Sequence, residues 1–122
     1  MPARELVTKE LASLLGVFSH PHRIRIVEEL RHGEHDVNAL QEILQVSHSR
    51  VSQHLSQLRA HKLVNERRKG RHHYYSLAKR ELAAWLLQGL DFIEAEMSNT
   101  DEIHDACEEV KNLWTKPSEE TK

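Results

Sequence analysis

Polar side chains dominate the segment 48–61, where Val51, Leu55 and Leu58 form a narrow apolar stripe at helical spacing. A helix with so thin a stripe leaves most of its surface free to bind something else. Arginine can pair with guanine through two hydrogen bonds, glutamine can do the same with adenine, and serine can bond a base or a phosphate. The pattern therefore predicts a helix that binds DNA, with Arg50 and Gln53 reading bases; a merely solvated face is the alternative. The candidate contacts are His48, Ser49, Arg50, Ser52, Gln53 and His54.

A second basic segment follows this helix. The runs 63–68 and 71–77 flank Gly70, and the second run alternates between apolar and polar residues. Alternation around a glycine turn predicts a β-hairpin. Cations at its tip suit phosphate or minor-groove contacts, and a charged turn without a ligand is the alternative. The candidate contacts are Arg67, Arg68, Lys69, Arg71 and His72.

Charge is divided unevenly along the chain, although the net charge is only -2. Residues 20–80 contain 12 Lys or Arg against 6 Asp or Glu, and nine of the ten histidines lie there. Residues 81–109 contain nine acidic residues and no Lys or Arg. Because the local field steers association more than the net charge does, this division suits a protein that offers one face to phosphates.

The elements that must position these residues are mainly helical. Apolar residues at steps of three and four predict helices over 4–18, from Pro21 to about Gly33, after Asp36, over 79–97 and over 101–114. Asp36 and Ser47 are suitable N-caps for the third and fourth helices. A short helix, a turn at residues 46–47 and an exposed polar helix together form a helix-turn-helix.

We therefore expect a mainly α fold with a small β-hairpin wing, which is a winged helix-turn-helix. Residues 1–97 would form the DNA-binding domain with long N- and C-terminal dimerisation helices, residues 98–116 a C-terminal helical extension, and residues 117–122 a disordered tail. The first and fifth helices carry more apolar residues than the core of such a domain needs, so a dimer is expected. Its candidate interface residues are Leu11, Leu14, Leu15, Leu82, Leu86, Leu90 and Ile93.

The chain closely resembles the bacterial ArsR/SmtB family of repressors in three separated segments, Phe18–Val27, Val51–Arg59 and Arg67–Leu77. The resemblance runs from about Leu11 to Leu90. It implies a bacterial homodimer built on the first and fifth helices, which binds a palindromic double-stranded DNA operator and is released by a metal ion or another signal.

The residues that relatives use to sense metals or oxidants differ in this chain. Some relatives bind metal through thiolates on the third helix, but residues 37–39 of this chain contain no cysteine. Others bind metal through ligands on the fifth helix, and the corresponding residues here are Lys79, Glu81, Phe92 and Ala95. The single cysteine, Cys107, has no partner for an intramolecular disulfide. Residues at helical spacing in the acidic C-terminal region could hold zinc, nickel or cobalt, although acidic residues at a helix start also complement its dipole. These candidate ligands are Asp101, His104 and Glu108.

The remaining classes are excluded by what the sequence lacks. No phosphate-binding loop or catalytic constellation suggests an enzyme, and no apolar run is long enough for a membrane helix. The N-terminus does not resemble a secretory signal, so a cytoplasmic protein is expected. No cofactor is expected either. Three alternatives remain for the effector, which is unknown: a repressor without the usual metal sites, a metal-responsive derepressor with a variant C-terminal site, and an effector-independent regulator or anti-repressor. His20, His22 and the pair at 72–73 are interpreted as packing or phosphate-facing histidines.

Overall fold

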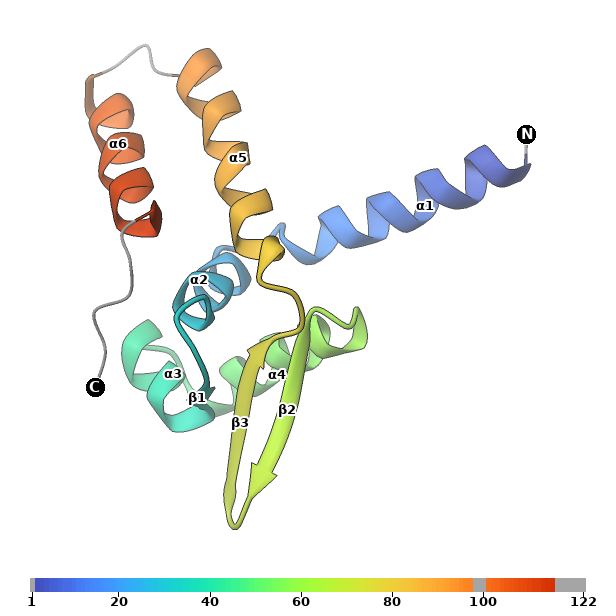
Figure 1. The fold of residues 1–122 in the computed structure, drawn as a ribbon, viewed down its shortest axis with the longest axis vertical. Helices are drawn as coiled ribbons and strands as arrows, with labels where there is room; N and C mark the ends of the chain where they lie inside the picture. Colours follow the sequence, from blue (N-terminus) through green and yellow to red (C-terminus); the bar gives the residue numbers. More distant parts are fainter. Residues whose placement is uncertain (1, 98–100, 116–122) are drawn as a thin grey trace. The chain divides into compact units, whose positions relative to one another are not determined.

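The computed structural model describes residues 2–97 and 101–115, and most of these are helical (Figure 1). The described residues divide into two compact units, and the division falls between Lys79 and Arg80. The first unit holds α1 (Pro2–Val17), α2 (Pro21–Leu30), β1 (His35–Asp36), α3 (Val37–Leu44), α4 (His48–Ala60), β2 (Val64–Lys69) and β3 (His72–Leu77), and the second holds α5 (Glu81–Met97) and α6 (Asp101–Thr115). The predicted fold class, a winged helix-turn-helix, is confirmed.

The core of the first unit lies where α2, α3 and α4 pack on one another. Each helix contributes fully buried aliphatic side chains, as the narrow apolar stripes predicted. α4 also packs against β2, and α2 and α3 pack against β3. The buried aliphatic residues are Val17, Ile26, Val27, Leu30, Leu40, Val51, Leu55, Leu58 and Val64. This core fixes α4 with one face inward.

The helix ends follow from local hydrogen bonds. Asp36 accepts a hydrogen bond from the backbone N–H of Ala39, and the Ser47 hydroxyl accepts one from that of Arg50, so both predicted N-caps are confirmed. Gln45 caps the C-terminal end of α3 with a left-handed φ of 60°, and the turn after α4 includes Lys62 with a φ of 59°. Neither residue is a glycine, so the sequence did not indicate these two left-handed positions.

The sheet has the strand order β1-β3-β2 and is antiparallel throughout. β2 and β3 form the predicted hairpin, with Lys69 opposite His72 beside the turn at Gly70, whose φ is 63°. Glycine adopts this conformation without the steric cost that a side chain would add. β1 was not predicted, because two residues are too few to show an alternating pattern.

In the second unit, α5 and α6 pack on each other, with Ala83 and Cys107 buried. The Lys111 ammonium joins the two helices, since it lies 2.7 Å from Asp91 and 2.6 Å from Glu94. The expected helix break at 98–100 and the expected disordered tail at 117–122 lie outside the described residues. The division into residues 1–97, 98–116 and 117–122 stays a prediction. Within the described residues, no helix has the length and hydropathy needed to cross a membrane.

Candidate nucleic-acid interface

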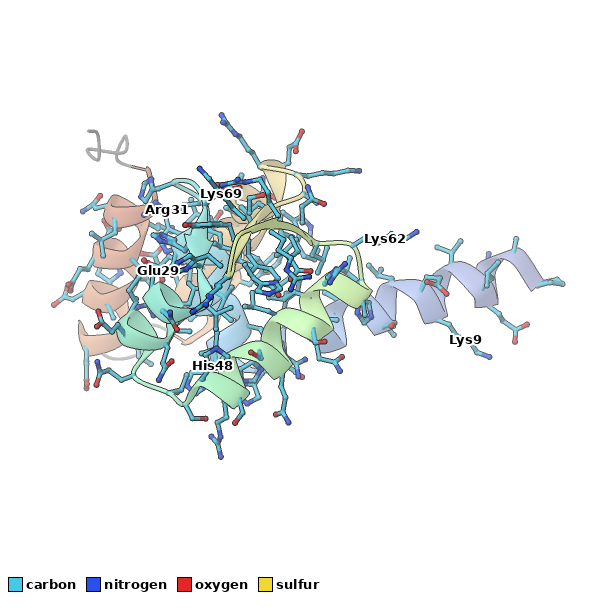
Figure 2. All side chains as sticks on the ribbon, turned by 90° about the horizontal axis from the view of Figure 1, so that it is seen from below. Lys9, Glu29, Arg31, His48, Lys62 and Lys69 are labelled. Atoms are coloured by element: carbon cyan, nitrogen blue, oxygen red, sulfur yellow. The ribbon has the colours of Figure 1, made fainter. Side chains whose placement is uncertain are left out.

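The outward face of α4 presents polar side chains near the N-terminal end of the helix. Ser49, Arg50 and Gln53 are exposed, whereas Val51 and Leu55 on the opposite face have no exposed surface. His48, which begins α4, is also exposed (Figure 2). Because the core holds one face of the helix, these donors and acceptors project on a rigid support.

His54 occupies a different position from the other candidates of this helix. Its side chain is 7% exposed, and its Nδ1 accepts a hydrogen bond of 3.2 Å from Nε of Arg23. Burial, together with the positive charges of neighbouring groups that include Arg23 and Arg50, lowers the pKa of His54 to about 4. The ring is thus neutral and faces the core, and His54 is left out of the contacts proposed below.

The hairpin presents an uncovered basic tip. Arg68, Lys69 and Arg71 are exposed, and none of the three forms an ion pair with another described residue. Lys69 is labelled at the hairpin in Figure 2. Free cations at the end of a protruding hairpin can reach phosphates on either side of a groove.

Arg67 lies one residue before these cations and is already engaged. Its Nε and a terminal nitrogen donate to the two carboxylate oxygens of Glu34 at 2.9 and 2.8 Å, and its guanidinium lies 4.9 Å from the ring centre of Tyr74. The pKa of Glu34 is lowered by the hydrogen bonds from Arg67. This bidentate pair competes with any phosphate for Arg67.

Glu66 joins the hairpin to the end of α4. One carboxylate oxygen accepts from Arg59 of α4 at 2.5 Å, and the other lies 2.5 Å from Nδ1 of His73 and accepts from the Tyr75 hydroxyl at 3.2 Å. The hydrogen bond with His73 is the main reason why the pKa of Glu66 is lowered. Sequence reasoning missed Glu66, because its partners are reached only through the register of β2 and β3.

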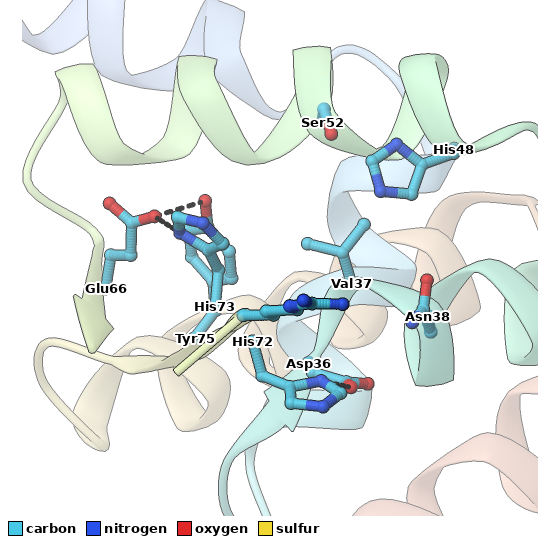
Figure 3. A pocket seen from close by; sticks show the side chains of 10 residues that line it. Asp36, Val37, Asn38, His48, Ser52, Glu66, His72, His73 and Tyr75 are labelled. Carbon is cyan, nitrogen blue, oxygen red and sulfur yellow. Dashed lines mark hydrogen bonds and ion pairs between the residues drawn. The ribbon is translucent and has the colours of Figure 1, made fainter. Parts of the chain in front are cut away.

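A pocket of about 290 Å³ lies between α4, the start of α3 and the hairpin. Figure 3 shows His48 and Ser52 of α4 on one side of it and His72, His73 and Tyr75 of β3 on the other. The His72 ring is 3.3 Å from Asp36, so this candidate DNA contact lies beside a carboxylate. Ser52 is half-buried at the pocket wall.

The candidate dimer residues lie on α1 and α5. On α1, Leu11 and Leu15 are 50% and 51% exposed, and Leu14 is half-buried. On α5, Ile93 is exposed, whereas Leu82, Leu86 and Leu90 are half-buried. The exposed leucines of α1 leave more apolar surface along this helix than is usual in a monomer, and such a surface suits burial against another chain.

Two of the three predicted C-terminal metal ligands, His104 and Glu108, lie close together, and they are joined by Glu94. Glu94 of α5, His104 and Glu108 each offer one ligand atom within 4.8 Å of the others, and Glu94 lies 3.6 Å from His104. Glu94 was missed, because the pairing of α5 with α6 cannot be read from the sequence. The side chain of Asp101 lies outside the described residues. Lys111 already bonds Glu94 and lowers the pKa of that carboxyl, so an ammonium competes with any metal there.

Comparisons with known proteins agree with one another. Residues 20–66 match the family model described as bacterial regulatory protein, arsR family. The arsenical resistance operon repressor of Staphylococcus xylosus is 35% identical over 104 residues, which are 85% of this chain and 94% of that protein. Among solved structures, NolR from Sinorhizobium fredii has a TM-score of 0.68 and 33% identity over 76% of this chain and 92% of that one. The homodimeric winged helix-turn-helix DNA-binding domain of Mb0332 from Mycobacterium bovis has a TM-score of 0.69 and 21% identity over 80% and 90%.

Proposed function

Because the chain belongs to the ArsR family of bacterial regulatory proteins, we propose that it is a homodimeric transcriptional repressor that binds a palindromic DNA operator. The family consists of DNA-binding regulators. The observation that carries the proposal is the exposed polar face of α4, at Ser49, Arg50 and Gln53, with the basic hairpin tip in the same unit. A rigid helix with free base-reading groups and a hairpin with free cations are the two parts that a winged helix-turn-helix uses on DNA.

The contacts divide by chemistry. Arg50 and Gln53 read base edges in the major groove, and His48 and Ser49 contact bases or phosphates beside them. Arg68, Lys69 and Arg71 hold phosphates or enter the minor groove. The remaining candidates, Ser52, Arg67 and His72, contribute less in this proposal because the first is half-buried and the other two lie against carboxylates.

Two chains pair through α1 and α5 in this proposal. The exposed leucines of α1 support it, and Mb0332 from Mycobacterium bovis is described as homodimeric. Two-fold symmetry sets two recognition helices about 34 Å apart, so the operator is an inverted repeat. The interface residues are Leu11, Leu14, Leu15, Leu82, Leu86, Leu90 and Ile93. Such a regulator acts in the cytoplasm, on double-stranded DNA.

Selection of binding sites from random duplex DNA, followed by sedimentation of the free protein, tests this function. We expect an inverted repeat to be enriched and the free protein to sediment as a dimer. Leu15→Glu should produce a monomer that loses operator affinity, whereas Lys9→Glu adds a negative charge elsewhere on α1 and should remain dimeric. If no sequence is enriched, the proposed function is wrong. If Leu15→Glu remains a dimer, α1 does not form the interface.

A second candidate function is metal-responsive derepression through the C-terminal cluster. Its support is the gathering of Glu94, His104 and Glu108 within ligand distance. Carboxylate and imidazole ligands suit zinc, nickel or cobalt, which would have to displace Lys111 from Glu94. Titration of the operator complex with each metal should release DNA from the parent protein but not from His104→Ala. Operator affinity that no metal changes would favour an effector-independent regulator.

A further inference from the structure

Three imidazoles, from the start of α2 and from α4, meet beside the buried face of α4. His20 precedes α2, His22 lies in its first turn, and His54 comes from α4. Their ring centres are 4.3 Å apart for His20 and His54, 5.2 Å for His20 and His22, and 5.5 Å for His22 and His54. One ligand nitrogen from each ring lies within 4.8 Å of the other two.

Not every ring nitrogen of these three histidines has a hydrogen-bond partner. Nδ1 of His20 accepts a long hydrogen bond of 3.4 Å from the backbone N–H of His22, and Nδ1 of His54 accepts from Arg23. Nδ1 of His22 is buried, yet it has no hydrogen-bond partner. A buried polar nitrogen without a partner costs free energy and therefore calls for an explanation.

We propose that His20, His22 and His54 form a binding site for a first-row divalent metal ion, with Zn²⁺ as the preferred ion, between the start of α2 and α4. Neutral imidazole is a common ligand of zinc, and three protein ligands with a water in the fourth position are a frequent tetrahedral set. Zinc–nitrogen bonds of about 2.0 Å place the ligand nitrogens roughly 3.3 Å apart, so nitrogens that lie within 4.8 Å of one another must approach by at most about 1.5 Å. This site differs from the C-terminal cluster and does not depend on DNA binding.

The chain itself brings two of the three ligands together. Pro21 separates His20 from His22 and restricts the backbone between them. Two ligands therefore come from one short segment, and only His54 comes from a different helix.

Arg23 is the competitor of the metal. In the neutral His54 ring, Nδ1 accepts from Arg23, so the proton of the ring is on Nε2. A metal at Nδ1 would replace Arg23, and a metal at Nε2 would move the proton to Nδ1, where it faces a second donor. Metal binding at either nitrogen therefore breaks the hydrogen bond between Arg23 and His54. Arg23 also donates to the carbonyl oxygen of Val17 at 3.1 Å, and that bond can persist.

Zinc titration of the full chain in the presence of a chromophoric chelator tests the site, with Co²⁺ absorption as a report of tetrahedral geometry. We expect one tightly bound ion at the triad, with affinity reduced about 100-fold in His22→Ala. His104→Ala is the matched control and should retain this binding. His22→Ala leaves the hydrogen bond between Arg23 and His54 intact and is therefore not expected to disturb the fold.

Arg23→Met supplies a change in the opposite direction. The variant keeps the aliphatic stem and removes the competing donor and its charge, so zinc affinity should rise about fivefold. The proposal is overturned if His22→Ala binds as many zinc ions as the parent with unchanged affinity, if the tight site is lost instead in His104→Ala, or if the parent binds zinc no more tightly than about 100 µM. Weaker binding by a folded Arg23→Met would overturn the competition.

Discussion

α4 and the β2–β3 hairpin are both basic, but they are held in place by different forces. α4 is fixed by buried side chains, with Val51, Leu55 and Leu58 fully inside the core. Within the hairpin only Val64 is buried, and polar contacts add to its attachment: β3 pairs with β1, Arg67 bonds Glu34, and Glu66 bonds Arg59 across to α4. All four of these ion-pairing side chains are partly exposed.

This difference has consequences for recognition. Burial of apolar surface is not screened by salt as ion pairs are, so α4 keeps its base-reading groups in place as the ionic strength rises. Exposed ion pairs are weak and are screened by salt, so the hairpin can exchange a carboxylate partner for a phosphate. The helix should therefore determine which sequence is bound, and the hairpin how strongly any DNA is bound.

Arg50→Ala provides the strongest test of this comparison. Loss of a bidentate contact with guanine should remove about 1–3 kcal/mol of discrimination between the operator and a site with the contacted base changed. The measurement is the ratio of the two dissociation constants at one salt concentration. Gln57→Ala, on an exposed position nearer the C-terminal end of α4, is the control and should leave the ratio unchanged. An unchanged ratio in Arg50→Ala would mean that the helix does not read this base through Arg50.

Mild acid should lower the stability of the fold through protonation of His54, at a pH above the range in which carboxylates take up protons. The pKa of His54 is about 4 in the folded chain, whereas an unfolded histidine has a pKa near 6.5. Unfolding therefore takes up a proton between these values, and stability falls as the pH drops below about 6.5. The loss by pH 5 should be about 2 kcal/mol relative to pH 7.5.

Denaturant unfolding at several pH values measures this loss. His54→Asn should show a smaller decrease between pH 7.5 and pH 5, and His48→Asn, on the exposed end of the same helix, should behave like the parent. Equal pH slopes in all three proteins would contradict the assigned role of His54.

The sequence was sufficient for features that depend on local chemistry. The apolar stripe of α4, the N-caps Asp36 and Ser47, and the turn at Gly70 were all predicted, because each depends on residues close along the chain. The order of the elements was also predicted from the apolar patterns, and the structure confirms it. The comparisons confirm the family resemblance.

Features that depend on distant partners could not be predicted. His54 lies at the edge of the apolar stripe, and only contact with Arg23 and His20, more than 30 residues away, reveals that it is buried. Glu94 joins His104 only through the packing of α5 on α6, and β1 exists only because β3 pairs with it. A helical pattern identifies which faces are apolar, but not which elements they meet.

Lys69→Ala should weaken binding to every DNA sequence by a similar factor. Lys69 is an exposed cation without an ion pair among the described residues, so its contact with a phosphate would release one counterion. The slope of log affinity against log salt should become shallower by about one, with discrimination unchanged. Lys9→Ala, a lysine of α1, is the control for loss of charge alone. A change in base preference with Lys69→Ala would show that the hairpin, too, reads sequence.

Glu34→Gln should produce the smallest effect and a change in the opposite direction. Glu34 holds Arg67 through two hydrogen bonds, so its neutralisation should free the guanidinium for a phosphate and remove a negative charge near the DNA. Affinity for all sequences should rise about twofold at low salt, and the salt slope should become steeper. The same salt titration measures both quantities. If affinity falls instead, Glu34 orients Arg67 for DNA rather than competing for it, and the hairpin is more rigid than its exposed ion pairs suggest.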